Sequence, residues 1–296
     1  MVLKNPPLKG GFFFILTLTI FTVQLLHTKQ TNVIMSYIFD FISNSIPKST
    51  FNQLTLGWIA IAIVLFPVLL KINPPYGRYS NSSWGPMVNN KMAWFFMEIP
   101  AIIIILWFFW NTTNYENKIV LSAFLLWIIH YFNRAFIFPF RLRTKSKKMP
   151  LAILLFGAFF NLVNAGLNGY WLAFIAPAHS ADLLSSPRFI IGIDIFIVGF
   201  LINQFHDTIL IHLRRFNTGY KIPTGGLFKY ISCPNYFGEI VQWIGFAIIC
   251  WSLPSLAFCV WTIVNLVPRA LNHQKWYREK FEHYPKSRKA IIPFIL

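Results

Sequence analysis

Charged residues are scarce in this sequence, and their scarcity excludes an ordinary soluble protein. Only 12% of the 296 residues are charged, whereas 56% are hydrophobic. Soluble domains average about 25% charged residues, so this chain lacks the polar groups that a water-facing surface requires. Several apolar stretches approach the roughly 20 residues that cross a bilayer as a helix. The composition therefore predicts an integral membrane protein.

Cysteine is also rare, and the common nucleotide-binding motifs are missing. Cys233, Cys250 and Cys259 show no Cys-x-x-Cys spacing and no Cys/His cluster, so we predict neither a disulfide framework nor a metal site. Without Gly-x-Gly-x-x-Gly or a Walker sequence, a nucleotide would have to bind outside a Rossmann fold or P-loop. The net charge of +17 comes almost entirely from Lys and Arg in loops between apolar segments, which is typical of membrane topology, and we expect no nucleic acid partner.

The apolar segments predict an all-α polytopic membrane protein with about seven transmembrane helices. The predicted spans are 54–71, 93–110, 119–139, 151–171, 189–210, 237–252 and 254–267. Pro254 separates the last two, because proline removes a helix hydrogen bond and clashes with the preceding turn. The apolar stretch 12–26 is a signal-anchor, an extra span or a cleaved signal peptide. We therefore expect an N-terminal extension over 1–50 and one membrane domain over 51–296.

Basic residues favour one side of the membrane. With the loop 141–148 placed in the cytosol, alternation puts 71–92, 211–236 and the C-terminal tail on the same side. Nineteen of the 26 Lys and Arg lie in these four segments. Because cytosolic loops carry such an excess, we predict a cytosolic C-terminus.

Ionisable residues inside the predicted spans are candidates for function, since each costs several kcal/mol in a bilayer unless it is paired or hydrated. They are Glu98, His130, Arg134, Asp194, Asp207 and Glu239. Asp194 stands alone in an apolar run and is interpreted as a residue that bonds neighbouring helices. Glu98 has plausible partners in Tyr131 and Arg134, which are three apart and share a helix face. A buried carboxyl hydrogen-bonded to a tyrosine hydroxyl would polarise a substrate carbonyl.

Two cytosolic segments have the composition of a cofactor site. The segment 219–228 contains paired glycines, which let a backbone approach a phosphate, and Arg214, Arg215 and Lys221 flank it. In the basic and aromatic tail, His273 and Tyr277 are four apart and would share one face of a helix. The segment 219–228 could equally be a simple turn, and the tail could equally be a basic segment that binds anionic lipid.

Several motifs, in order along the chain, closely resemble the steroid 5α-reductase family. They are His130-Tyr131-Phe132-Asn133-Arg134, Gly219-Tyr220-Lys221-Ile222-Pro223 with Gly225-Gly226, Asn235-Tyr236-Phe237-Gly238-Glu239, His273-x-x-Trp276-Tyr277, and Tyr284-Pro285-Lys286-Ser287-Arg288-Lys289 followed by Ile292-Pro293-Phe294. The resemblance covers the chain from about residue 55 to its end. Residues 1–50 lie outside it, and Met35 is a conceivable alternative start.

The resemblance implies a seven-helix enzyme that uses NADPH to saturate the Δ4 double bond of a 3-oxo-steroid. Hydride would pass to the enone β-carbon, while Glu98 and Tyr131 hold the ketone oxygen as the enolate develops. Trp94 and Arg134 would lie near the substrate. The implied cofactor contacts are Asn203, Asp207, Arg214, Tyr220, Asn235, Glu239, Arg269, His273 and Tyr277, with Arg141 and Arg143 as further phosphate partners. We expect Glu98 to be protonated or to share a proton with Tyr131, because a bare carboxylate would repel the enolate.

Three departures from the family pattern concern the substrate more than the cofactor. Met97 replaces the Gln that precedes the glutamate in many animal members. Phe205 stands where a histidine is expected, with His206 one place later. Gln242 replaces a second acid after Glu239.

Other functions remain open at this point. A trans-2-enoyl-CoA reductase or a polyprenol reductase shares the C-terminal motifs and the cofactor, although the chain shows no ubiquitin-like N-terminal region. A membrane methyltransferase would bind S-adenosylmethionine instead, and a sterol-binding protein would retain the fold without turnover. The resemblance further implies an endoplasmic reticulum enzyme among membrane lipids, which we expect to be a monomer.

Overall fold

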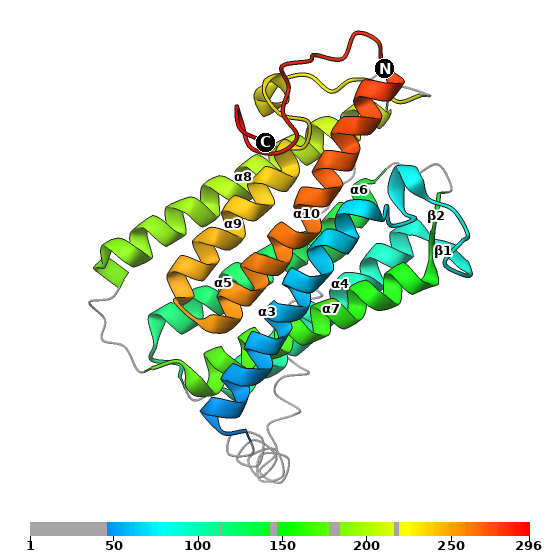
Figure 1. Cartoon of the computed structure of the whole chain (residues 1–296). Coiled ribbons are helices and arrows are strands. Elements are labelled where there is room, and N and C mark those ends of the chain that lie inside the picture. Colours follow the sequence, from blue (N-terminus) through cyan, green and yellow to red (C-terminus); the bar gives the residue numbers. More distant parts are fainter. Residues whose placement is uncertain (1–45, 113, 143–146, 178–183, 216–218) are drawn as a thin grey trace, which may run out of the picture. The chain divides into compact units, whose positions relative to one another are not determined.

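The computed structural model describes residues 46–112, 114–142, 147–177, 184–215 and 219–296. The chain divides into one unit of residues 1–48 and another of residues 49–296. The predicted apolar stretch at 12–26 lies outside the described residues. The second unit contains the helices that follow (Figure 1).

All seven predicted spans are helical, and the predicted all-α membrane class is confirmed. The helical stretches are α3 (Lys48–Lys71), α4 (Asn90–Asn111), α5 (Lys118–Phe132) continued by η2 (Asn133–Ile137) and α6 (Phe138–Arg141), α7 (Leu151–Tyr170) continued by η3 (Trp171–Ile175), α8 (Pro187–Arg215), α9 (Pro234–Cys250) and α10 (Leu253–Lys280). Among the described residues, six of these stretches are long and apolar enough to cross a membrane. The exception, α9, has 17 residues.

The break predicted at Pro254 is confirmed, whereas the predicted end of the last span is wrong. Helix α9 stops at Cys250, and Trp251 adopts a left-handed conformation with φ 46° before α10 begins at Leu253. Helix α10 then continues thirteen residues beyond the predicted boundary at 267, to Lys280. It continues because Leu266, Ala270 and Tyr277 keep one face of the helix buried beyond the apolar run.

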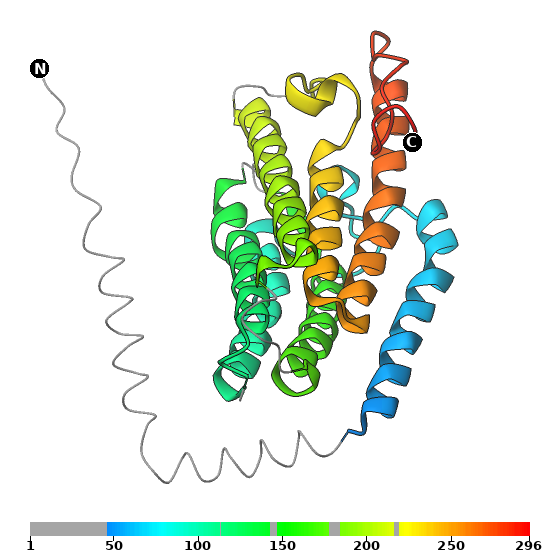
Figure 2. The same cartoon turned by 90° about the vertical axis from the view of Figure 1, so that its left-hand side faces the viewer.

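Glycines let α8 and α9 pack side by side along much of their length, as both views show (Figure 2). A Cβ at Gly199 would lie 2.2 Å from the Gln242 nitrogen, and one at Gly238 would lie 2.5 Å from the Asn203 nitrogen. Gly192, seven residues before Gly199, and Gly245, seven residues after Gly238, make an equivalent contact between the same two helices. The glycines therefore set the distance between two helices that carry predicted cofactor residues.

Asp194 makes no hydrogen bond or ion pair with a neighbouring helix among the described residues, so its interpretation as a residue that bonds helices is wrong. Its side chain is exposed on α8. The buried positions Gly192, Phe196 and Gly199 define the face of α8 that meets α9. Asp194 is two residues from Gly192, about 200° around the helix, and therefore points away from that contact.

Two short segments join the starts of α4 and α7. Strand β1 (Met87–Asn89) pairs antiparallel with β2 (Lys148–Pro150), with Val88 opposite Met149. The Asn89 side chain then caps α4 by accepting from the Lys91 and Met92 nitrogens at 3.0 and 3.3 Å. This pairing holds the 72–86 loop, which includes the short helix η1 (Gly77–Tyr79), beside the ends of the helices.

An aromatic cluster fills the interior of the bundle. Trp127 lies 5.4 Å from Trp243 and 4.9 Å from Phe258, and Trp243 lies 4.4 Å from Phe258, measured between ring centroids. The Trp127 indole nitrogen donates to the Ala101 carbonyl oxygen at 3.2 Å. The rings of His130 and Tyr131 on α5 lie 4.7 and 6.2 Å from that of Trp243, so these two polar residues pack against the aromatic cluster.

Candidate active site

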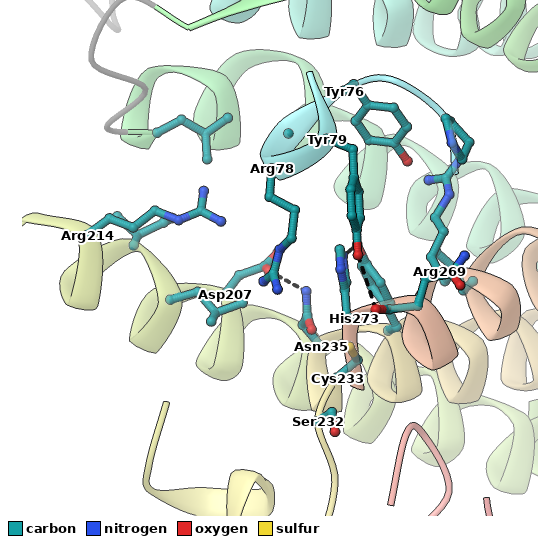
Figure 3. Close-up of a pocket in the computed structure, with 18 of the residues that line it drawn as sticks. Tyr76, Arg78, Tyr79, Asp207, Arg214, Ser232, Cys233, Asn235, Arg269 and His273 are labelled. Carbon is teal, nitrogen blue, oxygen red and sulfur yellow. Dashed lines mark hydrogen bonds between the residues drawn. The ribbon is translucent and has the colours of Figure 1, made fainter. Parts of the chain in front are cut away.

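A cavity of about 280 Å³ lies where the 72–86 loop, the ends of α5–α6 and α8, and parts of α9 and α10 meet (Figure 3). The ten predicted site residues that line it are Trp94, Arg134, Asp207, Arg214, Tyr220, Asn235, Glu239, Arg269, His273 and Tyr277. They come from five helices and one loop, so the fold gathers residues that are nearly 200 positions apart. We call this space the basic cavity.

The basic cavity contains more positive than negative side chains. Arg78, Lys147 and three predicted arginines line it, against the acids Asp207 and Glu239. Each arginine presents several donors in a planar fork that suits phosphate. The surplus of cations, in a cavity that also contains aromatic rings and neutral polar side chains, makes the cavity suitable for a polyanionic ligand.

The 72–86 loop closes one side of the basic cavity through Arg78. Its guanidinium carbon lies 4.1 Å from the Trp276 ring centroid and 4.7 Å from that of Tyr277. Arg78 Nη2 also donates to the Tyr277 hydroxyl at 3.3 Å. Nearby, the Tyr79 hydroxyl donates to the Asn272 carbonyl at 3.1 Å, and its ring stacks on His273. The predicted His273–Tyr277 face is therefore a cavity wall.

Helices α8 and α9 supply the polar side of the cavity. Asn235 Nδ2 donates to Asp207 Oδ1 at 2.9 Å. Behind them, Asn203 Nδ2 donates to the Asn235 carbonyl at 3.0 Å and approaches Glu239 Oε2 at 3.4 Å. Asn203 does not line the cavity, so it supports the neighbouring residues from behind.

The glycine pair of the 219–228 segment serves packing instead of lining the cavity. Gly225 and Gly226 have φ values of 93° and 51°, and a Cβ at Gly226 would lie 2.6 Å from His206 Nε2. His206 Nε2 accepts from the Leu227 nitrogen at 3.0 Å, which anchors η5 (Gly226–Lys229) to α8. Gly219 and Tyr220, rather than the pair, reach the cavity.

Residues 288–290 of the C-terminal motif bond to the segment 223–233, which leads into α9. The Ser232 and Cys233 nitrogens donate to the Lys289 and Ala290 carbonyls at 2.8 and 3.1 Å. Buried Arg288 donates from Nη1 to the Pro223 carbonyl at 3.2 Å. These contacts position the start of α9, and with it Asn235, at the cavity.

Glu98, Tyr131 and Arg134 form a second polar group, deeper in the bundle. Arg134 Nη2 lies 3.9 Å from Glu98 Oε1, and the same guanidinium stacks on Trp94 and Phe138 at 5.1 and 4.8 Å. Because Arg134 also lines the basic cavity, it connects that cavity to Glu98.

The Glu98 carboxyl and the Tyr131 hydroxyl meet through a residue that the sequence analysis missed. Asn161 Nδ2 donates to Glu98 Oε2 at 2.9 Å and to the Met97 carbonyl at 2.8 Å. The Tyr131 hydroxyl donates to Asn161 Oδ1 at 3.0 Å. The sequence contains a signal for it, since Asn161, Asn164 and Asn168 interrupt an apolar span, but a neutral amide in such a span is equally typical of a helix-packing contact.

Three polar atoms near the basic cavity are buried without a hydrogen-bond partner among the described residues. They are the Tyr76 hydroxyl, Arg78 Nη1 and His273 Nδ1. Burial raises the pKa of Tyr76, and Arg269, whose guanidinium lies 4.9 Å from the ring centroid, opposes that rise. Buried polar atoms are nearly always satisfied, so three together indicate a place where a ligand binds.

Of the two further predicted phosphate partners, only Arg141 is among the described residues. Arg141 donates from Nη2 to the Thr208 hydroxyl at 2.7 Å and does not line the cavity. Arg143 lies outside the described residues. Tyr76, Arg78 and Tyr79 take part instead, and the Pro-Tyr-Gly-Arg-Tyr sequence was the available signal.

Comparison with known proteins gives consistent matches. Residues 147–296 match the family model described as 3-oxo-5-alpha-steroid 4-dehydrogenase. A steroid 5-alpha-reductase of Arabidopsis thaliana is 40% identical over 258 residues, covering 84% of this chain and 98% of the relative. One of Solanum lycopersicum is 39% identical over the same shares. A 3-oxo-5-alpha-steroid 4-dehydrogenase 1 of Bos taurus is 40% identical over 80% of this chain and 93% of its own length.

Proposed function

The chain belongs to the steroid 5α-reductase family and is therefore an oxidoreductase, and we propose that it uses NADPH to reduce the Δ4 double bond of a 3-oxo-steroid. The observation that carries this proposal is the position of Arg134. It lines the basic cavity and lies 3.9 Å from Glu98, so the residues implied for the cofactor and for the ketone belong to one continuous site.

The basic cavity suits the nicotinamide cofactor of this family. Arg78, Arg214 and Arg269 can neutralise phosphates, and the unsatisfied Tyr76, Arg78 and His273 atoms can bond to ribose, phosphate or amide groups. NADPH is proposed over NADH because an extra phosphate matches the surplus of cations. When bound, the cofactor supplies the hydride.

The deeper polar group suits a ketone whose oxygen becomes negative. Hydride addition to the β-carbon turns the enone into an enolate, and donors already aimed at its oxygen stabilise this charge more than the ground state. Tyr131 supplies a hydroxyl donor, Glu98 a carboxyl and Arg134 a fixed positive charge 3.9 Å from that carboxyl. The surrounding rings of Trp94 and Trp127 exclude water from the reacting atoms.

The proposed setting is the endoplasmic reticulum membrane, with the basic cavity open to cytosolic NADPH. The segments that line it are the same basic loops that the positive-inside rule assigns to the cytosol. In the structure these loops contact one another: Lys147 donates to the Tyr220 hydroxyl at 2.9 Å, and Arg78 stacks on Trp276. An apolar steroid would reach Glu98 from the bilayer.

The proposal is tested by incubating detergent-purified protein with deuteride-labelled NADPH and progesterone or testosterone, followed by mass spectrometry. We expect one deuterium and one solvent hydrogen in the product. Replacing Tyr131 with Phe should lower the rate about a hundred- to a thousand-fold, because it removes one donor to the developing oxyanion. The matched control is Tyr115→Phe, which changes an exposed tyrosine in the loop between α4 and α5 and should leave the rate unchanged.

Each contrary result has a defined meaning. Reduction of an enoyl-CoA or a polyprenol in place of the steroid would retain the chemistry and refute the substrate. Absence of NADPH oxidation with all three substrates would refute the reductase, and methyl transfer from S-adenosylmethionine would then replace it. Equal rates for Tyr131→Phe and Tyr115→Phe would refute the role of Tyr131.

A further inference from the structure

Asn161 on α7 joins the two groups that the proposed reaction assigns to the ketone oxygen. Its side chain is buried, and it contacts Glu98 on α4 and Tyr131 on α5 at once. We propose that Asn161 is a positioning residue, an inference that rests on the proposed function. Its amide keeps the Tyr131 hydroxyl and the Glu98 carboxyl apart, so that both remain available to the substrate carbonyl.

The orientation of the Asn161 amide follows from its partners. The Met97 carbonyl, 2.8 Å from one end of the amide, can only accept a hydrogen bond. That end is therefore the Nδ2 group, whose second N–H meets Glu98 Oε2. The Oδ1 end then accepts the Tyr131 hydroxyl proton. Both N–H groups and the oxygen are used, so the amide has no freedom to rotate without leaving buried groups unsatisfied.

A glycine one turn earlier brings Asn161 to this place. A Cβ at Gly157 would lie 2.3 Å from Met97 Sδ, so the Met97 side chain packs directly against the α7 backbone at this glycine, and a larger residue there would have to displace it. Gly157 and Asn161 are four residues apart and share a face of α7. The close approach of the two helices and the hydrogen bonds of the amide thus reinforce one another.

The amide determines where the two protons can go. Because Nδ2 donates to Glu98 Oε2, the oxygen that remains to carry a proton is Oε1, on the side of Arg134. The Tyr131 hydroxyl meets a neutral acceptor, whereas an ionised carboxyl would bind its proton about twice as strongly. When a ketone oxygen arrives, the hydroxyl can turn its proton from Asn161 to the ketone with little loss. Without the amide, Tyr131 and Glu98 can bond to each other and withhold their protons from the substrate.

The test compares three variants under single-turnover conditions with saturating NADPH and a range of testosterone concentrations. Asn161→Leu should lower the chemical rate about ten- to a hundred-fold with KM nearly unchanged, since the groups remain but lose their alignment. The matched control is Asn164→Leu, because buried Asn164 lies one turn along α7 and bonds to Trp58 instead, at 3.2 Å. It should lower the unfolding temperature and leave the rate within about twofold.

Asn161→Asp gives a pH signature that a packing defect does not. At higher pH the new carboxylate cannot donate to Glu98 Oε2 and retains the Tyr131 proton, so the variant is slow. At lower pH the protonated acid donates to Glu98 as the amide does, so the variant rate divided by the wild-type rate should rise as pH falls. The Asn161→Leu ratio should stay flat. In the Tyr131→Phe background, Asn161→Leu should cost much less than in the wild type, because the two residues act as a unit.

The outcomes separate this proposal from the proposed function. An active wild type that loses activity in Tyr131→Phe, combined with an unchanged Asn161→Leu rate, overturns the role of Asn161 alone. Equal rate losses in Asn161→Leu and Asn164→Leu, each matching its loss of thermal stability, also overturn it. A wild type inactive on steroids overturns both, because the positioning role is defined by that reaction.

Discussion

The close contact between α8 and α9 gives a sharp prediction for Gly199→Ala. The added Cβ would lie 2.2 Å from the Gln242 nitrogen and 2.6 Å from its Cα, and these are backbone atoms that cannot turn aside. Carbon contacts are favourable near 3.5 Å, so the helices must separate locally by about 1 Å. Overpacking of this kind costs about 1–3 kcal/mol.

The same separation would disturb the cofactor side of the basic cavity. Asn203 on α8 bonds to the Asn235 carbonyl on α9 at 3.0 Å, and a 1 Å shift, the estimate above, would break this bond. We therefore expect the midpoint of thermal unfolding to fall by roughly 2–10 °C. The KM for NADPH should rise at the same time, since Asn235 positions Asp207 at the cavity.

Gly166→Ala is the matched control on α7. A Cβ there meets nothing within 4 Å, so alanine should be neutral or stabilise the helix by about 0.5–1 kcal/mol. Both variants are measured in detergent by intrinsic tryptophan fluorescence on heating, with NADPH titrations beside them. If Gly199→Ala unfolds at the same temperature as Gly166→Ala and keeps the wild-type KM, then the helix contact does not support the site as argued.

Three further predictions concern the basic cavity. Arg78→Leu should raise the KM for NADPH about ten-fold, because it removes the cation stacked on Trp276, which holds the 72–86 loop against the cavity. An unchanged KM in steady-state kinetics would show that the loop does not contribute to cofactor binding. Burial raises the pKa of the Cys233 thiol to about 12, so the thiol stays protonated at pH 8, and iodoacetamide followed by mass spectrometry should modify it only after unfolding. Deleting residues 288–296 should abolish NADPH binding, measured by calorimetry, because the Ser232–Lys289 backbone bond is lost; tight binding by the truncated chain would contradict this.

The sequence alone determined the class and the span layout of this protein. Apolar stretches near 20 residues have few alternatives to membrane helices. The bilayer core contains no water, so every backbone N–H and C=O must form a hydrogen bond within the protein, and a helix provides these bonds. Pro254 fixed a helix boundary by its chemistry, and the structure places the break there. The family motifs likewise predicted ten residues that line one cavity.

The end of α10 and the role of the glycine pair depended on contacts that no local pattern encodes. Helix α10 extends to Lys280 because its far half packs beneath the C-terminal motif, although the apolar run ends earlier. In the sequence, Gly225 and Gly226 are typical of a phosphate-binding loop. In the structure, both have positive φ values, and the absence of a side chain at Gly226 leaves room for the His206 ring. A positive φ requires glycine whatever the neighbour is, so the sequence cannot tell these roles apart.

Only the tertiary structure revealed how Glu98 and Tyr131 are joined. The sequence paired a carboxyl with a hydroxyl on two helices, but a third helix supplies the amide between them. Asn161 is neutral and stands in an apolar span, where a polar side chain is as readily a packing contact as a functional one. Its role depends on the approach of α7 to α4 at Gly157, a distance set by the packing of the whole bundle rather than by residues near Asn161 in the sequence.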